Sequence, residues 1–313
     1  MIHIACNIDS NYVKYCAVTL VSIFENNRQQ KVSVHIIAND LSETDRKTLT
    51  DIVLNYGNSV FFYKPDMNLL KGFTIKRFSN RISLATYYRC LLSDMLPTDI
   101  DKVLYLDCDI VVLGDITPFW ETPLDNVGVA AVEDIGCNEA TRYDILKYPQ
   151  KYSYFNAGVL LINLKYWRDH NMAQTCVDYY NQYPERLQFN DQCLLNSILH
   201  KNKVLVDLKW NVQDAFYRTP KTMDKAWHDK FANTLKHPII LHYTNRKPWS
   251  YDSQHPLRCE YFKYLALTPW KDDIALNNYF NKIKRFFRLL PFYIGIKKPK
   301  YINLSTISQT RNS

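Results

Sequence analysis

The amino-acid sequence predicts an α/β fold with a mostly parallel central sheet, and three observations support this prediction. Short apolar segments alternate with amphipathic helical segments over the first hundred residues. Of the 313 residues, 47% are hydrophobic and 22% are charged, which is typical of a globular protein with a sizeable core. No apolar run in the sequence reaches the roughly 18–20 residues of a membrane-spanning helix. We expect one domain at residues 1–270, followed by a tail at 271–313.

The predicted elements follow from hydrophobic periodicity and from capping residues. Ser42 and the acids after it are typical of a helix N-terminus, and Gly57 is typical of the C-terminal end of that helix. Pro97 should end the helix expected at 82–96. Strands are expected at 2–6, 32–38, 59–63, 102–106, 127–132, 159–164, 203–208 and 239–243. Helices are expected at 13–24, 42–56, 82–96, 166–183 and 191–201.

Acidic side chains follow two of these strands. The first strand runs into Asp9, and the central strand runs into Asp107 and Asp109. Ligands of parallel sheets bind beyond the carboxyl ends of the strands, and two carboxylates placed there can hold a divalent cation against a diphosphate. The alternative is that the two acids begin a turn. The apolar run at 110–113 favours the metal site, because acids between apolar runs are costly to bury without a cation.

Other polar residues could complete a site of this kind. His242 follows the apolar run 239–241 and could be a third ligand, better suited to Mn²⁺ than to Ca²⁺, and Lys247 could contact phosphate. Asn156, Asp191 and Gln192 could bind sugar hydroxyls through paired donors and acceptors. The alternatives are a structural histidine and ordinary turn or cap residues. The sequence contains neither GxGxxG nor GxxxxGK[ST], so phosphate must be held by other means.

The chain resembles the family 8 glycosyltransferases, the group that contains bacterial lipopolysaccharide galactosyl- and glucosyltransferases and glycogenin. The resemblance runs from residue 1 to about residue 270 and depends on the order of six segments. These are DSNY at 9–12, ATYYR at 85–89, VLYLDCD at 103–109, YFNAGVLLIN at 154–163, NDQ at 190–192 and HYTNRKPW at 242–249.

This resemblance implies a single Rossmann-like nucleotide-sugar-binding domain of the GT-A type. It also implies a retaining enzyme that moves galactose or glucose from a UDP-sugar to a glycan, such as a lipopolysaccharide or lipooligosaccharide core. Asp107, Asp109 and His242 would ligate Mn²⁺ or Mg²⁺, and Gln192, Asp191 and Asn156 would form the catalytic set around the sugar. The donor would be held by Asp9 at the uracil, Asn11 at the ribose, Lys247 at the diphosphate, and by Ser10, Tyr12, Arg89, Asp107, Cys108 and Asn245.

The expected mechanism follows from the acidic residue next to Gln192. Double displacement needs a carboxylate beneath the anomeric carbon, and Asp191, the one acid next to Gln192, is expected to hold sugar hydroxyls instead. We therefore expect departure and attack on the same face. A non-catalytic nucleotide-sugar or glycan-binding relative remains the alternative. A nucleotidyltransferase is disfavoured, because the N-terminal segment has no Gly-rich or basic triphosphate loop.

The basic charge is confined to the tail. Residues 274–313 carry eight Lys and Arg and no Asp or Glu, which equals the whole formal net charge of +8. Residues 279–290 separate into an apolar and a basic arc on a helical wheel, and Pro291 should end that helix. Such a helix suits an anionic membrane surface, although it could instead dock on the domain. We expect a cytoplasmic protein, peripheral on the inner face of the cytoplasmic membrane, with reduced cysteines and no nucleic-acid partner.

Overall fold

A computed structural model describes residues 1–75, 83–137, 139–219 and 223–307. The chain folds into two compact units. The first comprises Met1–Cys16, Asn27–Cys108 and Asp115–Asp207, and the second comprises Ala17–Asn26, Asp109–Gly114 and Leu208–Ser313. The tail expected at 271–313 falls within the second unit, and the boundary expected at residue 270 stays a prediction.

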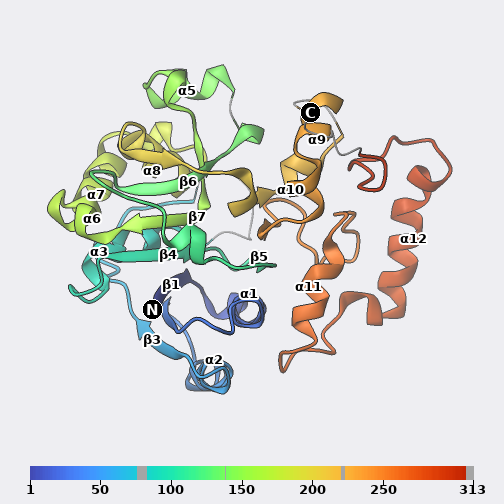
Figure 1. Ribbon diagram of the computed structural model, residues 1–313, viewed down its shortest axis with the longest axis horizontal. Helices are drawn as coiled ribbons and strands as arrows, with labels where there is room; N and C mark the ends of the chain where they lie inside the picture. Colours follow the sequence, from blue (N-terminus) through green and yellow to red (C-terminus); the bar gives the residue numbers. More distant parts are fainter. Residues whose placement is uncertain (76–82, 138, 220–222, 308–313) are drawn as a thin grey trace. The chain divides into compact units, whose positions relative to one another are not determined.

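The first unit contains a seven-stranded sheet with the order β3-β2-β1-β4-β7-β6-β8 (Figure 1). Every neighbouring pair of these strands is parallel, except for the two pairs that β7 makes with β4 and β6. The prediction of a mostly parallel sheet is therefore confirmed. The strands are β1 (Ile2–Asn7), β2 (Val32–Ile37), β3 (Ser59–Tyr63), β4 (Lys102–Leu106), β6 (Val129–Glu133), β7 (Phe155–Asn163) and β8 (Lys203–Leu205).

The reversed direction of β7 decides which residues meet at one edge of this sheet. The carboxyl ends of β1, β4 and β6 lie at the same edge, and β7 begins there because it is antiparallel to its two neighbours. The residues after Asn7, Leu106 and Glu133 are therefore gathered with the first residues of β7. This edge carries most of the expected site residues of the first unit.

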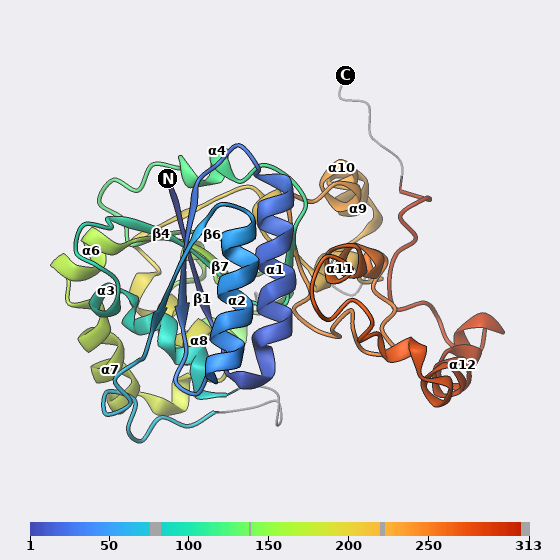
Figure 2. The ribbon, with the colours of Figure 1, turned by 90° about the horizontal axis from the view of Figure 1, so that it is seen from below.

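Helices cover the sheet of the first unit on both sides, as the alternation of segments predicts. Figure 2 shows α2 (Glu43–Asn55) on one side of β1, and α3 (Leu92–Met95) and α7 (Met172–Gln182) on the other. Ser42 and Asp45 form the capping box of α2, and Gly57 follows its end with a φ of 68°. The remaining helices of this unit are α4 (Thr117–Trp120), α5 (Ala140–Leu146), α6 (Leu164–Asp169) and α8 (Asn190–Leu199).

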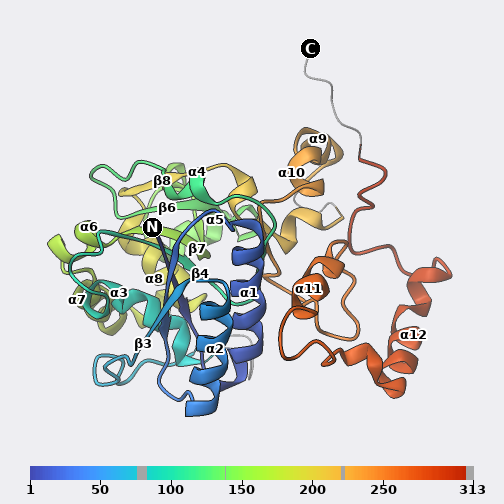
Figure 3. The ribbon, with the colours of Figure 1, turned by 60° about the horizontal axis from the view of Figure 1, so that its bottom comes forward.

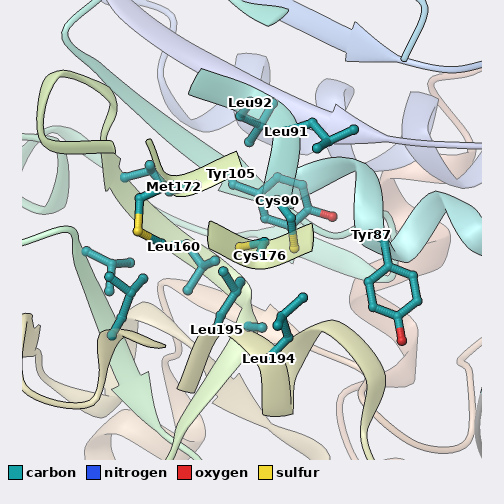
Figure 4. Packing of buried hydrophobic residues seen from close by; sticks show 14 of the residues in the cluster. Tyr87, Cys90, Leu91, Leu92, Tyr105, Leu160, Met172, Cys176, Leu194 and Leu195 are labelled. Carbon is teal, nitrogen blue, oxygen red and sulfur yellow. The ribbon is translucent and has the colours of Figure 1, made fainter. Parts of the chain in front are cut away.

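The main core of the first unit lies between the sheet and these helices. Figure 4 shows Tyr105 of β4 and Leu160 of β7 packed with Cys176 of α7 and with Leu194 and Leu195 of α8. These side chains are at most 1% exposed. Full burial of such side chains is worth about 1.5–3 kcal/mol each, so this core fixes β4, which Asp107 directly follows, and α8, which carries Gln192.

Two predicted helices differ in the structure. The described part of 82–96 is a 3-10 helix at Leu84–Leu91 that continues into α3. In 3-10 geometry residues i and i+3 lie on the same side, and this places Thr86 and Arg89 side by side at the sheet edge. The helix expected at 166–183 is divided into α6 and α7, because Asn171 adopts a left-handed conformation with a φ of 47°.

The second unit contains a three-stranded sheet with the order β5-β10-β9, formed by Ile110–Val112, Ile240–His242 and Val212–Gln213. Helix α1 (Val13–Asn26) contributes Ala17–Asn26 to this unit. The Thr19 hydroxyl donates to the carbonyl of Ile110 at 2.8 Å, and the Val112 amide donates to the Ser22 hydroxyl at 2.9 Å. These buried bonds fix β5, and His242 pairs with Ile110, so that Asp109 and His242 are held close together.

The C-terminal part of the second unit is helical, with α9 (Lys225–Lys230), α10 (Ala232–Lys236), α11 (Arg258–Leu265) and α12 (Tyr279–Tyr293) (Figure 3). The expectation that Pro291 ends the last helix is wrong. Pro291 lies in the final turn, where its missing amide removes one hydrogen bond, and the Ile294 amide still reaches the Leu290 carbonyl at 3.0 Å. Gly295, with a φ of 76°, follows the helix.

The apolar arc of α12 is exposed rather than docked. Tyr279, Phe280 and Phe287 are 66–71% exposed. The helix is held from another side, where Leu289 is buried and Arg285 donates to the carbonyls of Tyr251 and Ser253 at 2.6 and 2.8 Å. Among the described helices, none is both long enough and apolar enough to span a bilayer.

Candidate active site

The segment after β1 forms a short turn at the sheet edge of the first unit. The Asn11 amide donates to Oδ1 of Asp9 at 2.9 Å, so that Asp9 caps the 3-10 helix Ser10–Tyr12. The Ser10 hydroxyl donates to Oδ2 of Asp40 at 3.2 Å. Ser10 and Asn11 are exposed. The side chains expected to bind the nucleoside are therefore on an accessible turn, ordered by Asp9.

Asp107, directly after β4, is held by two donors of the first unit. A terminal nitrogen of Arg89 and the hydroxyl of Tyr105 donate to its Oδ1 at 2.9 and 2.7 Å. Nε of Arg89 lies 3.1 Å from Oδ2 of Asp191, and the guanidinium lies 4.3 Å from the centroid of the Tyr105 ring. Arg89 thus joins two carboxylates from different elements, and sequence reasoning named all three without predicting this contact.

Burial and charge act against each other in this group. Burial alone would lower the pKa of Arg89, but Asp107 and Asp191 raise that pKa above its ordinary value. Burial raises the pKa of Asp191, and Arg89 opposes this effect. The Thr86 hydroxyl donates a short hydrogen bond to Oδ1 of Asp191. Arg89 therefore stays charged, and its charge compensates the buried Asp191 and the partly exposed Asp107.

Gln192 belongs to a second polar network in the first unit. Its Oε1 accepts from the Ala157 amide at 3.1 Å and from Nδ2 of Asn156 at 3.3 Å, and its Nε2 donates to Oδ2 of Asp134 at 2.9 Å. Nδ2 of Asn156 donates to the same oxygen of Asp134 at 3.3 Å. These bonds fix the orientation of the side-chain amides of Gln192 and Asn156. Two members of the expected catalytic set are thus in contact.

Asp134 is a functional candidate that sequence reasoning missed. It directly follows β6 and is 6% exposed. The signal was available, because an acid after a buried apolar strand is the pattern that singled out Asp107. This pattern alone does not single out Asp134, because a lone acid after a strand is common and its hydrogen-bond partners come from distant segments.

In the second unit, Asp109 faces His242. Nε2 of His242 lies 3.1 Å from Oδ1 of Asp109, and Nδ1 of His242 lies 3.0 Å from Oδ1 of Asn211. An amide oxygen only accepts, so Nδ1 carries a proton, and in the neutral imidazole Nε2 then presents its lone pair to the carboxylate. Among the described residues, the buried Oδ1 of Asp109 receives no hydrogen bond of regular geometry.

Two acceptors that face each other at this distance fit a shared cation. A histidine that ligates a metal through Nε2 commonly donates its Nδ1 proton to an oxygen, and Asn211 supplies that oxygen here. A neutral imidazole with carboxylates suits Mn²⁺. Asn211 was not among the residues expected from the sequence, because an asparagine outside the matching segments gives no signal of its own.

Lys247 forms a short ion pair with Oδ2 of Asp109 and donates to the Tyr243 carbonyl at 2.8 Å. Burial would raise the pKa of Asp109, but the charge of Lys247 above all holds that pKa below its ordinary value. Asp109 is therefore ionised and available as a ligand. Asn245 is exposed in the same loop. The expected role of Lys247 at phosphate stays a prediction.

Cys108 differs from the acids on either side of it. Its side chain is 5% exposed, and its sulfur lies within 4.8 Å of those of Cys6 and Cys16. Any contact of Cys108 with a nucleotide would therefore come from its main chain. All eight cysteines lie in the described part of the chain, and each is a free thiol.

The sequence matches the protein-family model described as Glycosyl transferase family 8 over residues 3–253, a range that includes every candidate residue above. It is 30% identical over 278 residues to General stress protein A of Bacillus subtilis, with 86% of this chain and 95% of that protein covered. It is 28% identical over 276 residues to the Lipopolysaccharide 1,2-glucosyltransferase of Escherichia coli, with 86% and 79% covered. The solved structure of the galactosyltransferase LgtC, in complex with donor and acceptor sugar analogs, matches with a TM-score of 0.77 and 26% identity, covering 87% of this chain and 100% of that one.

Proposed function

Because the chain belongs to glycosyl transferase family 8, we propose that it transfers a hexose from a UDP-sugar to a glycan acceptor with retention of anomeric configuration. The observation that carries this proposal is the pair Asp109 and His242, whose acceptor atoms face each other as two ligands of one cation do. The hexose is glucose or galactose, since the relatives include a glucosyltransferase and a galactosyltransferase.

The proposed metal ligands are Asp109, His242 and Asp107. Asp107 is two residues before Asp109 in the chain, so its carboxylate is within reach of the same ion. When bound, Mn²⁺ or Mg²⁺ would offset the charge of the diphosphate leaving group. Lys247, now paired with Asp109, is the residue that would exchange this carboxylate for phosphate oxygens.

The donor nucleoside is proposed to bind the turn after β1. Asp9 would accept from the uracil, and Asn11 would contact the ribose, with Ser10 and Tyr12 beside them. The order of this turn supports the assignment, because the Asp9 cap leaves Ser10 and Asn11 exposed. Arg89 would act on the donor through Asp107, which it positions.

The transfer step is proposed to occur on one face of the sugar. The bond between the anomeric carbon and UDP breaks, the acceptor oxygen bonds to that carbon from the same side, and the acceptor proton passes to the departing phosphate. Asn156 and Gln192 would hold the sugar with fixed amide faces. Asp191 is bound by Arg89 and Thr86 in a buried environment, which supports a holding role for it rather than nucleophilic attack.

The acceptor is proposed to be a membrane-linked glycan such as a lipopolysaccharide core, and the protein to act at the inner face of the cytoplasmic membrane. The exposed aromatic side chains of α12 support this location. An open surface pocket of about 400 Å³ lies at the C-terminal end of α12, and its lining contains four cationic side chains and one aromatic, namely Arg288, Phe292, Lys297, Lys298 and Lys300. Such a lining favours anionic phosphate groups.

A liposome flotation assay tests the membrane part. Protein with the native α12 should float with vesicles rich in anionic lipid at low salt, and Phe286→Ser with Phe287→Ser should remain at the bottom. The matched control replaces Leu54 and Phe61, two exposed apolar residues of the first unit, with Ser. If the α12 variant floats as well as the native protein, the helix is not the membrane contact.

Release of UDP from a panel of UDP-sugars, with Mn²⁺ or with EDTA, tests the reaction. Slow hydrolysis of one UDP-hexose should be lost with EDTA and with Asp109→Ala. It should persist in Asp51→Ala, which removes an exposed acid of α2. Calorimetric binding of UDP with Mn²⁺ but no turnover with any donor or acceptor would favour a non-catalytic binding protein. Absence of Mn²⁺-dependent UDP binding would contradict the proposal.

A further inference from the structure

Three cysteines form a buried group in the first unit. Cys6 belongs to β1, Cys16 belongs to α1, and Cys108 follows β4, so three separate elements contribute one thiol each. Their sulfur atoms all lie within 4.8 Å of one another. The side chains are 0%, 0% and 5% exposed. This convergence forms a site with three sulfur ligands and almost no exposed surface.

The charge of the ligands decides which centre fits. Three thiolates around Zn²⁺ would leave one net negative charge, and around Cu⁺ they would leave two, in a region without exposed surface. Uncompensated buried charge is costly. Structural zinc also takes four ligands, and the group formed by the described residues supplies three. A trivalent centre that forms three bonds to sulfur is neutral and needs no fourth ligand.

We propose that Cys6, Cys16 and Cys108 form a binding site for trivalent arsenic, taken up as neutral arsenous acid. Three As–O bonds break and three As–S bonds form. Each thiol proton passes to one departing hydroxyl, so three waters are released and no atom changes oxidation state. Since reactants and products are neutral, the exchange places no charge in the interior.

Uptake has a consequence for the active site. Cys108 lies between Asp107 and Asp109, and three bonds to one arsenic atom draw the sulfur atoms together and fix Cys108. Loss of Mn²⁺-dependent transfer is therefore expected, and this consequence depends on the proposed function. The binding itself does not depend on it, so binding and activity are measured separately.

The test uses the full chain in a Cys259→Ser background, which removes the exposed thiol. After incubation with arsenite, native mass spectrometry should show one arsenic atom gained and three hydrogens lost per chain. Alkylation followed by peptide mapping should show Cys6, Cys16 and Cys108 protected and Cys90, Cys137, Cys176 and Cys193 modified after unfolding without added thiol. A mass gain that maps to other cysteines, or no mass gain, overturns the proposal.

Substitution of one of the three cysteine ligands provides a second test of the proposed arsenic site. Cys16→Ala should weaken arsenic retention by roughly 10²- to 10⁴-fold, the advantage of a third linked ligand. Cys90→Ala is the matched control, because Cys90 forms a buried hydrogen-bonded pair with Cys176 away from the site. Equal retention in Cys16→Ala, or loss in Cys90→Ala, contradicts the assignment. Protection mapping needs no substitution at the site, so the test stands even if Cys16→Ala fails to fold.

Discussion

Nε2 of His242 and Oδ1 of Asp109 lie 3.1 Å apart, although both atoms are acceptors when the imidazole is neutral and donates its Nδ1 proton to Asn211. The pair is therefore favourable only with a proton or a cation between the two atoms. This relationship makes Asn211, rather than either ligand, the residue that decides whether the site is ready for a metal.

Asn211→Leu should weaken Mn²⁺ binding in the presence of UDP by about 10- to 100-fold, the range found for loss of an outer hydrogen-bond partner. The leucine removes the acceptor that fixes the imidazole while it keeps the side chain's size. Isothermal titration calorimetry with Mn²⁺ measures the effect. Asn55→Leu, at an exposed position that ends α2, is the control. Unchanged Mn²⁺ affinity in Asn211→Leu would mean that His242 is oriented by other contacts.

Asp134 and Gln192 should act as a unit. Gln192→Ala should slow transfer by about 10- to 100-fold without abolishing it, as loss of one or two hydrogen bonds worth 1–3 kcal/mol predicts. Asp134→Ala removes the acceptor that the amides of Gln192 and Asn156 share and should cost a similar factor. Because the two residues share one network, the double variant should be little slower than either single variant. Fully additive effects of the two substitutions on kcat would show that Asp134 acts independently of Gln192. A sugar trapped covalently on the enzyme would rule out the proposed same-face transfer.

Arg89→Met should lower the free energy of unfolding by about 3–5 kcal/mol, because the buried Asp191 would lose its counter-charge and the partly exposed Asp107 would lose the same partner. Urea denaturation without metal measures this loss. Lys47→Met breaks the exposed pair with Asp51 and should cost less than about 1 kcal/mol. If both variants lose the same small amount, the Arg89 cluster is not a stabilising centre, and its role is confined to the positioning of Asp107.

Much of the first unit could be predicted from local pattern. The strands at 32–38, 59–63 and 102–106 and the Ser42 cap were recognisable, because alternating apolar segments and caps are local signals. The family segments also placed Asp107, Asp109 and His242 in one set. The 3-10 winding at Leu84–Leu91 was not predictable, since it depends on contacts of Thr86 and Arg89 with Asp191, a hundred residues away.

The site residues that the sequence did not predict were missed for one physical reason. Asp134 and Asn211 act by hydrogen-bonding a predicted residue, not by a spacing of their own. The strand order decides which segments far apart in the sequence lie close together, and the antiparallel direction of β7 is the most important part of that order. The apolar arc of α12 was predicted from the helical wheel, but its exposure and the length of the helix were not. A proline in the last turn removes a single hydrogen bond, which the helix tolerates.

His255 of the second unit should make stability depend on pH in a defined window. Its ring is 2% exposed, and it lies against Tyr217 and Tyr243 with centroids 4.8 and 4.9 Å away. Burial lowers its pKa from 6.5 to about 4. Between these values the unfolded chain binds a proton that the folded chain does not. Stability is therefore unaffected by this group above pH 6.5 and falls as the pH decreases towards 4, by roughly 3 kcal/mol in total.

His255→Phe keeps an aromatic ring in this place and removes the titrating group. The difference in unfolding free energy between pH 7 and pH 4.5, measured by urea denaturation, should be smaller in this variant by about 2–3 kcal/mol. His237→Phe, at an exposed position, should leave that difference unchanged. The comparison between variants matters, because His35, whose pKa is also lowered to about 4 by burial, adds a similar loss to every protein in the set. An equal acid sensitivity in His255→Phe and the native chain would mean that His255 is protonated as easily in the folded state as in the unfolded one.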